Sequence, residues 1–151
     1  MLRDDISTSL KQAMKAGDKR RISTLRLVNA AIKDRDIEAR GAGRGPPADD
    51  ELHALLQKMI KQRHESLAIY THAGRADLAA QEREELEIIS DFLPQQLSEA
   101  ETAEAITGAI RETGAAGIKD IGKVMAALKA RYAGRMDFAK AGATVKTQLA
   151  G

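Results

Sequence analysis

The feature that most constrains this chain is a long apolar stripe at helical spacing between residues 52 and 70. Apolar side chains recur there at intervals of three and four, which places them on one face of a helix. The helix that carries the stripe, from about Asp49 to His72, is over twenty residues or roughly 35 Å long, and its apolar face must be buried against other elements. Only 3% of the residues are aromatic, and no run of β-branched or aromatic residues indicates a strand. The sequence therefore predicts an all-α fold.

Turn and capping residues divide the first part of the chain into helices. We expect a helix from about Arg3 to Lys15 and a second, capped by Asp18, to about Ala39. A Gly/Pro loop over 41–47 follows, after which Asp49 is the expected N-cap of the long helix. A fourth helix, from Asp77 to Pro94, would return along it. These elements predict an N-terminal helical domain, residues 1–94, that contains a long α-hairpin.

A second, smaller domain is expected over residues 95–151. Ser98 and Glu101 have the spacing of a capping box at the start of a helix. The next helix would begin near Ile118, and a last one, capped by Asp137, would bury Phe138. Three short helices then form the C-terminal domain, with the hinge at residues 94–97.

Several kinds of chemistry find no support in the sequence. There is no cysteine, which excludes disulfides, thiolate metal sites and a cysteine nucleophile. The histidines lack a metal-binding spacing, and no Gly-rich phosphate loop is present. The glutamates at 82, 84, 85 and 87 spread around a helix, which is typical of a solvated surface. We therefore expect no catalytic residues, no metal and no cofactor.

The same sequence carries no sign of membrane insertion or export. No run of 18 apolar residues exists, and the first residues are too acidic for a signal peptide. The expectation is a soluble cytoplasmic protein without a membrane partner.

Positive charge is concentrated near the C-terminus. The formal net charge is only +2, yet from Ile121 onward six basic residues face a single acid, Asp137. A helical unit with excess positive charge is a candidate nucleic-acid surface. The candidate residues are Lys119, Lys123, Lys129, Arg131, Arg135, Lys140 and Lys146.

Alternatives remain open for each basic feature. The C-terminal face could be an ordinary solvated helix face. Gly134-Arg135 could contact a phosphate or could simply end a helix. Lys19-Arg20-Arg21 with Arg26 forms a second basic patch, partly offset by nearby acids, which could equally be solvated.

Three segments resemble one known family. They are Thr24-Leu25-Arg26-Leu27-Val28-Asn29-Ala30-Ala31-Ile32-Lys33, then Asp91-Phe92-Leu93-Pro94-Gln95-Gln96-Leu97-Ser98, and the run from Ile118 to Arg135. Together they resemble the GatB/YqeY family, and the length is that of a free-standing YqeY-like protein. The residues from about Pro94 onward are similar to the tail of the B subunit of the glutamine-dependent tRNA amidotransferase.

The resemblance implies a link to tRNA-dependent amidation or translation. The main hypothesis is a non-catalytic accessory protein that docks tRNA through the seven basic residues, with a tRNA-modifying or amidotransferase enzyme as a possible partner. The alternative is a protein-protein adaptor whose long N-terminal hairpin docks a partner. Family resemblance alone implies carbon-nitrogen ligase activity with glutamine as amido-N-donor, and no residues in the sequence match that chemistry.

Overall fold

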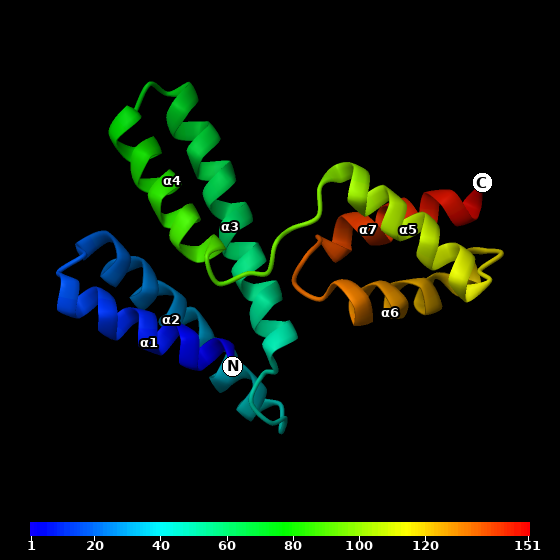
Figure 1. Ribbon diagram of the computed structural model, residues 1–151, viewed down its shortest axis with the longest axis horizontal. Coiled ribbons are helices and arrows are strands. Elements are labelled where there is room, and N and C mark those ends of the chain that lie inside the picture. Colours follow the sequence, from blue (N-terminus) through cyan, green and yellow to red (C-terminus); the bar gives the residue numbers. More distant parts are fainter. The chain divides into compact units, whose positions relative to one another are not determined.

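The computed structural model covers residues 1–151 and is entirely helical, which confirms the predicted all-α class (Figure 1). The chain forms two compact units, Met1–Leu93 and Pro94–Gly151, whereas the sequence placed the division after Pro94. The helices are α1 Leu2–Ala16, α2 Lys19–Gly41, α3 Asp49–His72, α4 Ala76–Ser90, α5 Glu99–Thr113, the 3₁₀ helix η1 Ile118–Asp120, α6 Ile121–Tyr132 and α7 Phe138–Ala150.

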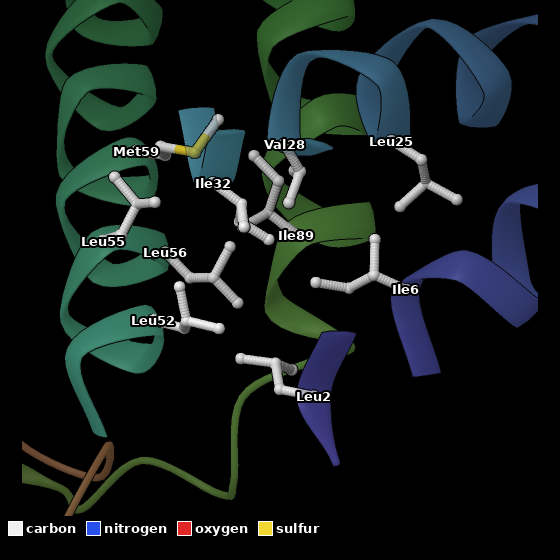
Figure 2. Packing of buried hydrophobic residues seen from close by; sticks show 10 residues of the cluster. All are labelled: Leu2, Ile6, Leu25, Val28, Ile32, Leu52, Leu55, Leu56, Met59 and Ile89. Atoms are coloured by element: carbon white, nitrogen blue, oxygen red, sulfur yellow. The ribbon is translucent and has the colours of Figure 1, made fainter. Parts of the chain in front are cut away.

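The first unit has one apolar core to which all four helices contribute. The helices α3 and α4 lie side by side as the long hairpin, and α1 and α2 form a second one (Figure 1). Figure 2 shows the core side chains pointing toward one another from the four helices. They are Leu2, Ile6, Leu25, Val28, Ile32, Leu52, Leu55, Leu56, Met59 and Ile89.

The N-termini of α2 and α3 test two of the predicted N-caps. The Asp18 carboxylate accepts a hydrogen bond from the Arg21 backbone N–H at 3.1 Å, so the predicted cap of α2 is confirmed. Asp49 is not the N-cap of α3, because Ala48 holds that position and Asp49 is already helical. Its carboxylate instead accepts from the Leu2 backbone N–H at 3.3 Å. Asp49 therefore joins the start of α1 to the start of α3.

The acidic cluster of α4 is not a uniformly solvated surface. Glu85 is 7% exposed and makes an ion pair with Arg63 of α3 at 3.2 Å. Gln81 donates a second hydrogen bond to the same carboxylate at 3.3 Å, and Arg63 also donates to the Met59 carbonyl oxygen. Burial and the neighbouring Glu85 carboxylate raise the pKa of Glu82. The hairpin thus contains a polar contact that the sequence pattern did not reveal.

The second unit is a three-helix arrangement with its own core. The most deeply buried side chains are Ile106, Val124, Leu128 and Val145. At the start of α5 the predicted capping box is confirmed, since Ser98 Oγ accepts from the Glu101 N–H and Glu101 Oε1 accepts from the Ser98 N–H.

The helix expected from Ile118 is interrupted at its start. Residues Ile118–Asp120 form the 3₁₀ turn η1, and α6 begins only at Ile121. The Asp120 carboxylate accepts hydrogen bonds from the backbone N–H groups of Ala116 and Gly117 at 2.9 and 3.4 Å. These backbone hydrogen bonds favour the tighter turn that precedes the helix.

The turn between α6 and α7 is hydrogen-bonded to the first residues of the second unit. Gly134 has φ 74°, a conformation that favours glycine, and its carbonyl oxygen accepts from the Gln96 side chain at 2.6 Å. The Leu97 N–H donates to the Arg135 carbonyl oxygen, and Arg135 Nε donates to the Gln95 carbonyl oxygen, both at 2.9 Å. Gly134-Arg135 thus follows the end of α6, as one of the two interpretations expected, while a phosphate contact of Arg135 stays a prediction.

Candidate functional site

The structure spreads the seven predicted basic residues over several elements of the second unit. Lys119 lies on η1, while Lys123, Lys129 and Arg131 lie on α6. Arg135 lies in the following turn, and Lys140 and Lys146 lie on α7. That these residues form a single binding site remains a prediction.

Two of the seven residues have partners inside the unit. Arg131 makes an ion pair with Glu112 of α5 at 3.2 Å, which raises its pKa. Arg135 is half-buried, bonds the Gln95 carbonyl oxygen and places its guanidinium 5.9 Å from the centre of the Tyr132 ring. The five lysines are exposed and make no ion pair. Both arginines therefore have contacts within this unit, and their role in binding remains a prediction.

A shallow pocket of about 400 Å³ lies between α5 and the end of α6. Two arginines and two glutamates line it with four uncharged residues, so it has no dominant charge. Its lining residues are Leu97, Glu101, Glu104, Ala105, Gly108, Arg131, Tyr132 and Arg135. At least three of the charged groups, Glu101, Arg131 and Arg135, already bind within the unit. The pocket does not define a recognisable ligand chemistry.

A second basic surface lies on the outer side of α2 in the first unit. Lys19, Arg26, Lys33 and Arg40 follow one another at intervals of seven residues and are all exposed. Seven residues make nearly two helical turns, so the four side chains form a row along one edge, about 10 Å apart. None of the four makes an ion pair. We call these four residues the basic row.

The other basic residues of α2 behave differently. Arg20 pairs with Glu84 at 2.9 Å and Arg21 with Asp91 at 3.3 Å, both reaching α4 or its end. Arg35 pairs with Glu38 on the same helix at 3.3 Å. The predicted patch of Lys19-Arg20-Arg21 with Arg26 is thus divided, because Arg20 and Arg21 are committed to the fold. Unlike Arg20 and Arg21, the members of the basic row make no ion pair with another helix of the unit.

Beside the basic row runs a stripe of exposed residues with alternating spacings of four and three. Leu27 is 48% exposed and Ile37 is 59% exposed, with the small Ala30 between them. Ser23 and Asp34 complete the stripe. We call these five residues the outer seam. Leu25, Val28 and Ile32, on the opposite side of the same helix, are buried in the core.

The sequence analysis missed the basic row. The signal was present in the seven-residue interval between its four members. It was obscured because Arg20 and Arg21 adjoin Lys19, and only the tertiary contacts separate paired from unpaired cations.

Other kinds of site are not evident. No group of three His, Cys, Asp or Glu side chains could hold a metal ion. None of the helices combines the length and hydropathy needed to cross a membrane.

The fold and its surfaces define a small all-helical protein with two compact units and an exposed, charged helix face. A family model described as Yqey-like protein matches residues 3–149. The chain belongs to this YqeY-like family, as the sequence resemblance predicted.

Curated relatives from fungi share one name, "Altered inheritance of mitochondria protein 41, mitochondrial". The relative from Lachancea thermotolerans is 34% identical over 110 residues, covering 72% of this chain and 57% of the relative. That from Pyrenophora tritici-repentis is 28% identical, covering 83% and 70%. That from Saccharomyces cerevisiae strain YJM789 is 34% identical, covering 57% and 45%. The chain thus spans about half the length of several curated relatives it matches.

These comparisons correct two predictions. The relatives' name refers to the inheritance of mitochondria and to no RNA, which overturns the predicted function of a tRNA-binding accessory protein. The relatives are also named as mitochondrial proteins, which overturns the predicted cytoplasmic location. The links to amidotransferase and translation have no support in these comparisons either.

Proposed function

We propose that this protein works by binding another protein and that the outer side of α2 is the contact surface. The observation that carries the proposal is the two-sided character of α2. One side supplies Leu25, Val28 and Ile32 to the core, while the other exposes Leu27 and Ile37 beside the four exposed cations of the basic row, of which Arg40 interacts electrostatically with Asp36. Exposed large apolar side chains next to polar residues are typical of protein-protein contact surfaces.

The relatives' name is compatible with this proposal. It describes a trait of a whole organelle and names no reaction or substrate. A protein that acts through contacts would fit such a trait.

Site-specific photocrosslinking tests the proposal. A benzoyl-phenylalanine placed at Leu27 in the full chain, in its native cells, should give a crosslinked product of higher mass that protease removes and nuclease does not. The matched control is Ile69, an apolar side chain on α3 that is 65% exposed but has no basic row beside it. A product equally strong at Ile69, or one removed by nuclease, would refute the proposal.

A further inference from the structure

The spacing of the outer seam specifies the kind of element that fits it. Its five residues follow one another at alternating intervals of four and three, and the average interval of 3.5 residues is that of a seam between two packed helices. Such a seam packs against a second helix that repeats apolar residues at the same spacing. A flat or irregular partner surface would not follow it over the length of α2.

The basic row indicates which charge that second helix should carry. Arg26 and Lys33 directly precede the seam residues Leu27 and Asp34, and Lys19 and Arg40 lie seven residues before and after them. In an interface between two helices this position flanks the seam and contacts the partner helix. The opposite edge offers no free charge, because Thr24 is buried and Glu38 is paired with Arg35. Charge complementarity therefore favours acidic residues on one edge of the partner.

We propose that α2 docks an amphipathic helix of a partner protein that carries Asp or Glu every seven residues along one edge. This inference rests on the proposed function and specifies the partner. Asp34 stands in the middle of the seam, where a polar residue fixes the register of two helices. The exposed apolar side chains of Leu27 and Ile37 in the seam favour a protein partner over a phosphate backbone.

A second copy of this chain fits the surface less well. Antiparallel pairing of two α2 helices would set one basic row against the other, and like charges at flanking positions disfavour association. Parallel pairing would set most members of the row against uncharged residues such as Ala31.

Designed peptides provide the probe. One helical peptide about as long as α2 carries leucine at seam spacing and glutamate every seven residues along one edge, and a second has lysine in place of those glutamates. Binding of each labelled peptide to the full chain is followed by fluorescence anisotropy. We expect the acidic peptide to bind at least about tenfold more tightly, with an affinity that falls as salt rises from about 50 to 300 mM.

Variants of the chain then locate the contact. Arg26→Glu with Lys33→Glu should lower the affinity about tenfold, since several weak ion pairs become repulsive together. Leu27→Ser with Ile37→Ser should lower it by a similar factor. All four side chains are exposed, so circular dichroism should show an unchanged fold. Lys11→Glu with Lys15→Glu on α1 is the matched control, because both lysines are exposed in the same unit and unpaired, and it should change the affinity less than twofold.

Other outcomes would overturn the inference. Equal binding of both peptides, or no loss with the α2 variants, would exclude an acidic helix. Tighter binding of a DNA duplex that the same variants abolish would indicate a nucleic-acid surface, and a dimer dissociated by the apolar variants would indicate self-association. If Leu27 still crosslinks to a protein after Arg26→Glu with Lys33→Glu, protein binding survives and only the acidic helix is refuted.

Discussion

The buried ion pair of the long hairpin allows a quantitative prediction. Arg63→Ala leaves the Glu85 carboxylate, whose side chain is only 9% exposed, with a hydrogen bond from Gln81 but without its cation. Removing one partner of a buried pair typically costs 3–5 kcal/mol, because the remaining charge is desolvated and uncompensated. Arg63 is itself only 13% exposed, so packing of its stem is lost as well. We expect the free energy of unfolding of the first unit to fall by about 3 kcal/mol.

Urea denaturation followed by circular dichroism measures this loss, and hydrogen exchange in α3 and α4 assigns it to the first unit. The matched control is Arg75→Ala, because Arg75 and Asp77 form an exposed pair with side chains 57% and 68% exposed. Exposed pairs contribute about 0–1 kcal/mol, so the control should change little. Replacing both buried partners, as Arg63→Met with Glu85→Leu, should restore most of the stability. An effect of Arg63→Ala no larger than that of Arg75→Ala would refute the reasoning.

Four further predictions concern the second unit and the loop before α3. Ser98→Ala removes the side-chain half of the capping box and should lower stability by about 1 kcal/mol in thermal melts, whereas Ser98→Asp should retain most of it. Gly108 lies inside α5 with nothing within 4 Å of an added Cβ, so Gly108→Ala should raise stability by up to about 1 kcal/mol, and a loss would show hidden crowding. Backbone hydrogen bonds lower the pKa of Asp120 in the folded state, so its contribution is present above the unfolded pKa of about 3.9 and is lost as pH falls below it. Melting temperatures between pH 3 and 7 should show that loss in the native chain and a smaller one in Asp120→Asn. Limited digestion with a protease of broad specificity should cut first around Arg44, in the exposed loop, and early cleavage within 94–97 would contradict the hydrogen bonds that hold that segment.

The sequence by itself determined the helical class and most helix ends. Apolar residues at intervals of three and four are sufficient to identify the buried side of a helix, and local hydrogen bonds explain the caps at Asp18 and Ser98. These features depend on residues within a few positions of one another. They can therefore be predicted without knowledge of the tertiary contacts.

Only the tertiary structure decided which charges are available to a partner. Glu85 belonged to an acidic cluster in the sequence, yet packing of α3 on α4 buries it against Arg63. Arg20 and Arg26 look alike in the sequence, but Glu84 of α4 reaches only Arg20. An ion pair between distant segments depends on how their helices face each other, and no local pattern encodes that orientation. The basic row emerges only after such pairs are removed, which is why the sequence pattern did not separate it from the neighbouring Arg20 and Arg21.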